Sequence, residues 1–143
     1  MIALDSSVLI ASVLTWHDEH AAAAAAVARA LTSRAGVVIP AHALFEAYSV
    51  MTRMPDAYRV SPRDAEAFLR ENFSMARIAS FPSRSVWPLL GRLAEEELGG
   101  GITYDATILA AAQDAGATSL LTLNPRDFER LSPRIEIIVP NRG

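Results

Sequence analysis

Acidic side chains stand beside short apolar stretches at four places far apart in the chain. Asp5 follows the apolar residues 2–4, Glu46 follows 44–45, Asp105 ends the stretch 102–105, and Asp127 lies just after Asn124. An ionised carboxylate that leaves water without a partner is strongly unfavourable. A divalent cation would keep such a cluster ionised, and hard oxygen ligands suit Mg²⁺ or Mn²⁺ rather than zinc.

The chemistry that matches such a cluster is hydrolysis of a phosphodiester. Mg²⁺ usually takes one or two protein carboxylates and keeps several waters, so three or four acids suggest one tightly bound ion and a second that arrives with substrate. A metal-activated water then attacks in line, and the metal also stabilises the leaving oxygen. The acids therefore predict a metal-dependent enzyme that acts on phosphate esters.

Each acid also has a plainer explanation. Asp5 is a good helix N-cap, Glu46 could face solvent or pair with an Arg, and Asp105 could gain from the helix dipole. Asp127 follows Pro125, where Asp is common in turns. Four independent roles of this kind give no reason for the acids to converge on one rim, and convergence is what the metal interpretation requires.

Strands that alternate with longer helices must position these acids. Strands are predicted at 1–4, 37–39, 76–81, 118–123 and 134–139, and helices from Ser6 or Ser7 to about 14 and at about 19–34, 40–54, 62–72, 83–98 and 104–115. This alternation predicts an α/β fold with a short, mostly parallel central sheet flanked by helices. Ligands of such sheets bind beyond the carboxyl ends of the strands, which places Asp5 and Asn124 on the same rim.

Composition narrows the class of protein further. The chain has 143 residues, about half of them apolar, which predicts a single domain over residues 1–143. The net charge of −3 excludes a globally basic nucleic-acid binder, and the absence of Lys excludes a P-loop or a Schiff base. No apolar stretch is long enough to span a bilayer, and the absence of Cys fits a reducing compartment, so we expect a cytoplasmic protein.

Four motifs occur in one order along nearly the whole chain. Residues 2–10 place an Asp before a small hydroxyl residue, Glu46 lies within 40–54, residues 104–112 surround Asp105, and 116–128 contain Thr, Asn and Asp-Phe. Together they resemble the motifs of PIN-domain ribonucleases. Within that family the sequence is similar to the VapC-like toxins of bacterial type II toxin-antitoxin modules.

The resemblance implies a PIN-like fold and Mg²⁺- or Mn²⁺-dependent endoribonuclease activity. It implies that Asp5, Glu46, Asp105 and Asp127 are catalytic and that these four, with Asn124, bind the metal. The fourth acid of the family falls at 124 or at 127; here position 124 is an amide and position 127 is an acid. Whether Asn124 or Asp127 completes the site stays open at this point.

Partners also follow from the resemblance. It implies an RNA substrate such as tRNA or ribosomal RNA, a homodimer, and neutralisation by a small antitoxin protein. We expect Ser7 and Arg126 to contact the substrate, since both adjoin acidic motifs. The helix before the triple glycine at 99–101 is a candidate dimer surface.

Two other functions are compatible with parts of the sequence. A non-catalytic PIN-like module would bind RNA or a protein without cleavage, and Asn124 in place of an acid favours it. A Mg²⁺ phosphatase of the haloacid-dehalogenase type is disfavoured, because Asp5 lacks a second Asp two residues later.

Overall fold

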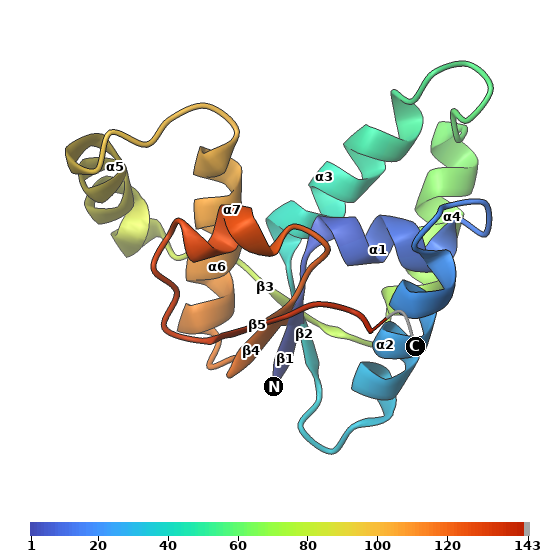
Figure 1. The fold of residues 1–143 in the computed structure, drawn as a ribbon, viewed down its shortest axis with the longest axis horizontal. Coiled ribbons are helices and arrows are strands. Elements are labelled where there is room, and N and C mark those ends of the chain that lie inside the picture. Colours follow the sequence, from blue (N-terminus) through green and yellow to red (C-terminus); the bar gives the residue numbers. More distant parts are fainter. Residues whose placement is uncertain (142–143) are drawn as a thin grey trace.

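A five-stranded parallel sheet forms the centre of the molecule, seen in a computed structural model that describes residues 1–141 (Figure 1). The strand order is β3-β2-β1-β4-β5, so the first strand of the sequence lies in the middle. The strands are β1 (Ile2–Leu4), β2 (Val37–Pro40), β3 (Arg77–Ala79), β4 (Ser119–Leu121) and β5 (Glu136–Ile138). Every pairing among these strands is parallel, which confirms the predicted class of fold.

Helices flank the sheet on both sides. In Figure 1, α6 and α7 lie to the left of the strands, α1 and α2 lie to the right, and α5 stands furthest out. The helices are α1 (Ser6–Val13), α2 (His20–Thr32), α3 (Ala41–Thr52), α4 (Pro62–Phe73), α5 (Val86–Glu95), α6 (Ile102–Asp114) and α7 (Pro125–Glu129), with a short 3₁₀ turn, η1 (Ser83–Ser85). No helix among residues 1–141 combines the length and the apolar character that a bilayer span requires.

Local sequence signals set several boundaries. The Ser61 side chain caps α4 by accepting a hydrogen bond from the Asp64 backbone N–H at 3.1 Å, and Pro62 occupies the first turn. Gly116 has a φ of +87° just after α6, a conformation that glycine adopts without strain. These signals explain why element order could be predicted from the sequence.

Several boundaries differ from the prediction by a few residues, and two of these differences have a clear local cause. The segment after Pro125 is a short helix, α7, rather than only a turn, because proline is favourable in the first turn of a helix. Helix α5 ends at Glu95 rather than 98, because Glu97 adopts a left-handed conformation with φ of 55° and the Leu98 N–H bonds back to the Leu93 carbonyl.

The core joins the sheet to both helical layers. Ala3 and Leu4 of β1 are fully buried, and Phe73 and Phe128 are among the largest buried side chains. One continuous cluster of buried apolar residues extends from Ala3 to Leu131. The central strand is therefore held firmly, and so is the residue that follows it.

Candidate active site

Asp5 directly follows the central strand. Its backbone N–H bonds to the Leu121 carbonyl at 3.1 Å, and the residue is only 1% exposed. It occupies the N-cap position of α1, but its carboxylate makes no capping hydrogen bond. Asp5 therefore has the backbone position of a helix cap, but its carboxylate does not cap the helix.

Three hydroxyl groups surround the Asp5 carboxylate. Ser7 Oγ and Thr122 Oγ1 each donate to Oδ2 at 2.8 Å, and Ser6 Oγ lies 3.4 Å from Oδ1. Burial raises the pKa of Asp5 most strongly, the hydrogen bonds oppose that rise, and the Glu46 charge adds to it. The carboxylate is thus fixed in orientation while its pKa stays above the usual value.

Thr122 belongs to the last motif, but the sequence analysis gave it no role in the site. It is fully buried, it donates to Asp5, and its Oγ1 accepts a hydrogen bond from the Asn124 N–H at 2.9 Å. The sequence feature that could have indicated this role is a single hydroxyl residue between Leu121 and Leu123. Ser7, expected to contact substrate, has its hydroxyl on Asp5 and accepts from the Leu123 N–H at 2.9 Å.

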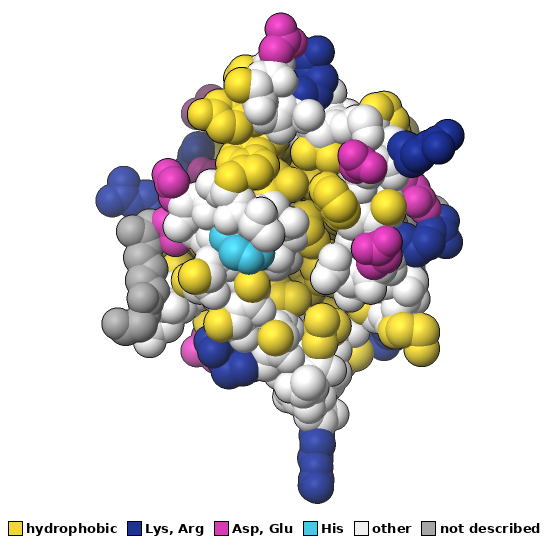
Figure 2. Space-filling view, turned by 90° about the vertical axis from the view of Figure 1, so that its right-hand side faces the viewer, with side chains coloured by type: hydrophobic (Ala, Val, Ile, Leu, Met, Phe, Trp, Pro, Cys, Tyr) yellow, Lys and Arg dark blue, Asp and Glu magenta, His cyan; other side chains and the backbone are white. Residues whose placement is uncertain are grey.

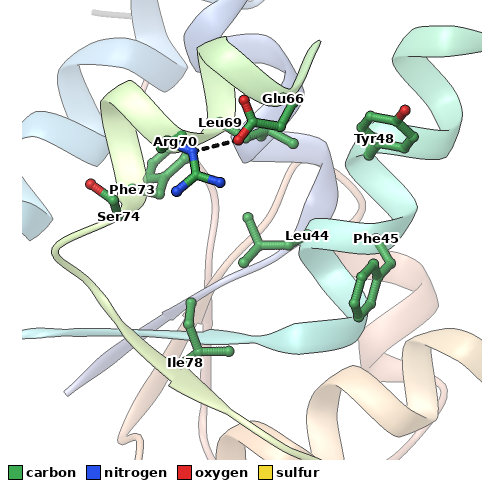
Figure 3. Close-up of a pocket in the computed structure, with 9 residues that line it drawn as sticks. All are labelled: Leu44, Phe45, Tyr48, Glu66, Leu69, Arg70, Phe73, Ser74 and Ile78. Carbon is green, nitrogen blue, oxygen red and sulfur yellow. Dashed lines mark hydrogen bonds and ion pairs between the residues drawn. The ribbon is translucent and has the colours of Figure 1, made fainter. Parts of the chain in front are cut away.

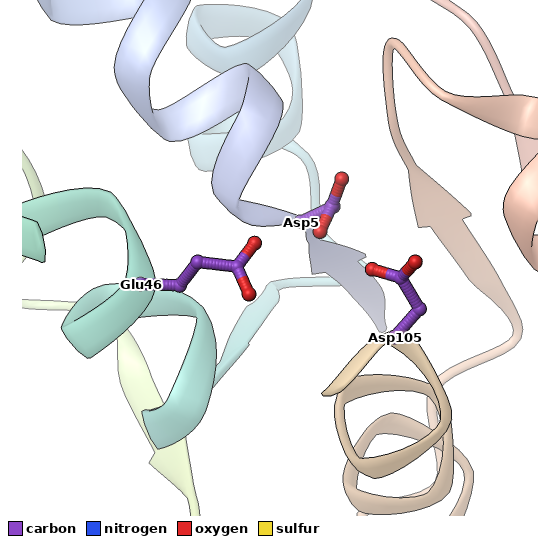
Figure 4. A group of neighbouring side chains, drawn as sticks. All are labelled: Asp5, Glu46 and Asp105. Atoms are coloured by element: carbon purple, nitrogen blue, oxygen red, sulfur yellow. The ribbon is translucent and has the colours of Figure 1, made fainter. Parts of the chain in front are cut away.

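Two helices bring further carboxylates to Asp5. Glu46 lies in α3 and Asp105 in the first turn of α6, and both side chains point toward Asp5 (Figure 4). One carboxylate oxygen from each of the three residues lies within 4.8 Å of the others. Ser6 Oγ donates to Glu46 Oε1 at 2.5 Å, and His42 Nε2 lies 3.7 Å from Glu46 Oε2. The strand and the two helices thus assemble one compact acidic cluster.

The cluster is electrostatically unfavourable without a counter-charge. The pKa of Asp105 rises to about 7, first because of burial and then because of the negative charges of Asp5, Glu46 and Asp127. Within residues 1–141 the Arg ion pairs involve acids outside the cluster, and the basic side chain that reaches it is His42, with Nε2 3.7 Å from Glu46 Oε2. Hard carboxylate oxygens at this spacing fit Mg²⁺ or Mn²⁺.

The remaining predicted residues lie around the start of α7. Asp127 is outside the group of oxygens within 4.8 Å, yet its charge contributes to the raised pKa of Asp105. Asn124 is the exposed N-cap residue of α7, and Arg126 is exposed in the first turn. The structure therefore brings three acids together and places Asp127 close enough to act on one of them.

An aromatic pair adjoins the acids. The rings of His42 in α3 and Tyr104 in α6 stack with centroids 5.1 Å apart and planes within 10°. His42 lies one helical turn before Glu46, and Tyr104 directly precedes Asp105. The sequence analysis assigned no role to either ring.

An apolar groove lies on another face of α3. It has a volume of about 720 Å³ and runs between α3, α4 and β3 (Figure 3). Its lining residues are Leu44, Phe45, Tyr48, Glu66, Leu69, Arg70, Phe73, Ser74 and Ile78. Figure 3 shows an ion pair between Glu66 and Arg70 at the edge of an otherwise apolar surface. The sequence analysis did not predict this groove.

The side of the molecule that carries α2 and α4 is also partly apolar. Figure 2 shows hydrophobic side chains gathered along the middle of this face, with acidic and basic side chains beside them.

The fold and the acidic cluster agree with what sequence comparison finds. The family model described as PIN domain matches residues 2–132, and the chain belongs to the PIN domain family. Ribonuclease VapC40 of Mycobacterium tuberculosis is 40% identical over 141 residues, which is 96% of this chain and 99% of that protein.

Solved structures agree in fold. The crystal structure of M. tuberculosis VapC20, a sarcin–ricin loop cleaving toxin, has a TM-score of 0.70 and 18% identity, and covers 90% of this chain and 94% of its own. DNA-bound VapBC from Salmonella typhimurium has a TM-score of 0.70 and 20% identity, with 98% of both chains covered. At these identities the likeness shows a shared fold.

Proposed function

We propose that this protein is a metal-dependent endoribonuclease and the toxin of a toxin-antitoxin module. The observation that carries the proposal is the convergence of Asp5, Glu46 and Asp105, with one carboxylate oxygen of each within 4.8 Å of the others. The 40% identity to a ribonuclease over nearly the whole chain supports RNA as the substrate.

In this proposal Asp5, Glu46 and Asp105 hold one Mg²⁺ or Mn²⁺ ion. When bound, the ion supplies an activated water nucleophile and stabilises the charge on the leaving oxygen. The hydroxyls of Ser7 and Thr122 keep the Asp5 carboxylate in place for this role.

The neighbouring polar residues have smaller roles in the proposal. Asp127 acts as the fourth acid, because its charge already reaches Asp105, and Asn124 faces the same rim as a weaker oxygen ligand. Arg126, exposed on α7, contacts an RNA phosphate. Ser7 lies beside the path by which that phosphate reaches the acidic cluster. A tRNA or ribosomal RNA target places the reaction in the cytoplasm.

The test is cleavage of a mixed pool of tRNA and ribosomal RNA by the purified protein with Mg²⁺ or Mn²⁺, with EDTA, and after Asp5→Asn. Discrete fragments should form only in the wild type with metal. Asp56→Asn is the matched control, because it removes an exposed acid that pairs with Arg59 in the segment after α3. Fragments that persist in EDTA would contradict a metal-dependent reaction.

The alternative is a module that binds RNA or protein without cleavage, and the amide at position 124 favours it. Calorimetry with Mg²⁺ on the wild type and on Asp105→Asn separates the two functions. A binding event in the wild type that is lost in the variant supports the enzyme. RNA binding without any metal event and without cleavage would support the binding module.

We propose that the apolar groove between α3 and α4 binds the antitoxin. Structures of the same fold include VapBC, and the groove offers an apolar floor with charged side chains at its edge, as an amphipathic segment requires. The expected result is that the antitoxin of the same module binds wild type but binds Tyr48→Ala more weakly. Equal affinity for both proteins would mean that the antitoxin binds another surface.

We also propose a homodimer and one domain over residues 1–143. Helix α5 buries Leu93 and exposes Val86, Trp87 and Leu90, which together form an apolar face free to meet a second copy. Sedimentation should give a dimer for the wild type and a monomer for Trp87→Ser. The continuous core supports the single domain, although residues 142–143 lie outside the described part.

A further inference from the structure

We propose that the stacked rings of His42 and Tyr104 form a platform on which an unpaired base of the RNA, next to the phosphate that is cut, stacks against Tyr104. This inference rests on the proposed ribonuclease function and adds a substrate-binding residue to it. It is carried by the position, the exposure and the ring geometry of the pair.

The position of the pair ties it to the acids. His42 and Glu46 lie one turn apart in α3, with His42 Nε2 3.7 Å from Glu46 Oε2, and Tyr104 directly precedes Asp105 in α6. A phosphate bound at the acidic cluster would therefore have the ring pair beside it. The base attached to a nucleotide flanking that phosphate is the group that could reach the rings.

Tyr104 stands on the exposed face of α6. Tyr104 is 54% exposed although α6 buries its neighbours Ile102 and Ala106. His42 stacks on one face of the Tyr104 ring, and the residue still keeps 54% of its surface exposed. An exposed aromatic side chain thus stands at the edge of the site, and in this proposal a base meets the ring face away from His42.

The geometry is that of a stacking platform. The two ring planes lie within 10° with centroids 5.1 Å apart, so a third flat ring on the other face of Tyr104 would continue the stack. Bases of single-stranded RNA stack on aromatic side chains in this way, and removal of one such side chain weakens binding about 5- to 150-fold. Every base has a flat face, so the platform selects for unpaired bases and does not prefer one kind of base.

A purely structural role is the competing explanation. The stack joins α3 to α6, so in this explanation its sole role is to hold Glu46 and Asp105 at a fixed distance. The two roles differ in what they control: a structural role requires the stack for metal affinity, whereas a platform requires Tyr104 for RNA affinity alone.

The experiment compares Tyr104→Leu, Tyr104→Phe and Tyr58→Leu. Tyr58 is a matched control, since it is also 54% exposed and its ring lies 5.0 Å from that of Trp16, in the segment between α3 and α4. Three quantities are measured: anisotropy of fluorescent tRNA from the pool with Mg²⁺, KM and kcat for cleavage of the pool, and Mg²⁺ affinity by calorimetry.

The platform predicts that Tyr104→Leu weakens tRNA binding and raises KM by roughly tenfold, with Mg²⁺ affinity unchanged. Tyr104→Phe and Tyr58→Leu should behave like the wild type. Unchanged RNA binding in Tyr104→Leu, reduced Mg²⁺ affinity in it, or equal loss in Tyr104→Phe would each overturn the platform. The binding data test it even if the wild type cuts no RNA, an outcome that would count against the proposed ribonuclease instead.

Discussion

Helix α3 carries two surfaces of opposite character. One face presents Glu46 to a cluster of acids drawn from distant parts of the chain, while another presents Phe45 and Tyr48 to an open apolar groove. The acidic cluster is partly buried, and the charges of Asp5, Glu46 and Asp127 add to the burial that raises the pKa of Asp105. The groove is exposed, and Phe45 is 71% exposed. Each surface is unfavourable when left alone, the first because of charge repulsion and the second because of contact with water.

The difference shows what each surface needs. A cluster of like charges is relieved by a cation, whereas an exposed apolar patch is relieved by an apolar partner. One helix therefore supports two kinds of binding that should respond to different substitutions. The predictions below test that separation, beginning with the largest expected effect.

The largest effect is expected when a charge is removed from the acidic cluster. Asp105→Asn should reduce Mg²⁺-dependent cleavage by at least about 100-fold, because changes to residues that only support metal ligands already reduce affinity or activity about 10- to 100-fold. Phe45→Ser, on the groove, should leave kcat unchanged. Steady-state cleavage assays measure both variants, and a comparable loss of kcat in the two would show that the surfaces are not separate.

Thr122→Val should have the next largest effect. The change keeps the shape of the side chain but removes the hydroxyl that donates to Asp5 at 2.8 Å. We expect Mg²⁺ affinity to fall about 10- to 100-fold in calorimetry. Thr118→Val is the control, because Thr118 precedes the same strand at its other end, where its hydroxyl lies 3.4 Å from the Met1 carbonyl. Equal affinities in all three proteins would argue against a role for Thr122 in orienting Asp5.

The fold was more predictable than the details of the site. Alternation of short apolar strands with helices and the rule that ligands bind at carboxyl ends of parallel strands were enough to place Asp5 at the rim. The role of Thr122 was not visible, because a single Thr beside a strand is common and its partner, Asp5, is 117 residues away. The pKa of Asp105 likewise depends on charges from three other segments.

Surface features were the least predictable. The groove exists because α3, α4 and β3 meet at a particular angle, and no local pattern encodes that angle. The stack of His42 on Tyr104 joins residues 62 positions apart, each unremarkable in its own segment. Contacts of this kind depend on tertiary packing, which a single sequence does not display.

A smaller effect is expected from the groove. Phe45→Ser should weaken binding of the antitoxin about tenfold, as loss of a contributing aromatic contact does at other interfaces. Because Phe45 is exposed, the free energy of unfolding should change by no more than about 0.5 kcal/mol. Isothermal titration and urea unfolding measure the two quantities. A stability loss well beyond this, or full antitoxin affinity, would be inconsistent with an interface role.

The smallest effect concerns pH and the metal-free protein. Asp105 has a pKa of about 7 in the folded state against 3.8 unfolded, so the folded state binds more protons between these values. The free energy of unfolding therefore falls as pH rises through this window. The loss of stability that comes from ionising Asp105 is complete above pH 7. In EDTA, Asp105→Asn should therefore melt only slightly higher than the wild type at pH 5, where part of this loss of stability is present, and roughly 3 °C higher at pH 8.

Calorimetric scans at both pH values, with and without Mg²⁺, check this expectation. Mg²⁺ should raise the melting temperature of the wild type at pH 8 and leave that of Asp105→Asn nearly unchanged, since only the wild type retains the full set of ligands. A variant that melts lower than the wild type at pH 8 in EDTA would mean that the acids do not repel one another.

The central place of β1 also has a consequence for protein synthesis. Asp5 is made first, but the strand that completes its surroundings, β4, begins only at Ser119, and Thr122 follows that strand. A growing chain already contains Asp5 and Glu46 long before Asp105 and Thr122 have left the ribosome. The acidic cluster with its hydroxyl support is therefore complete only after more than four fifths of the chain has emerged, whereas α3, α4 and β3, which line the apolar groove, emerge earlier.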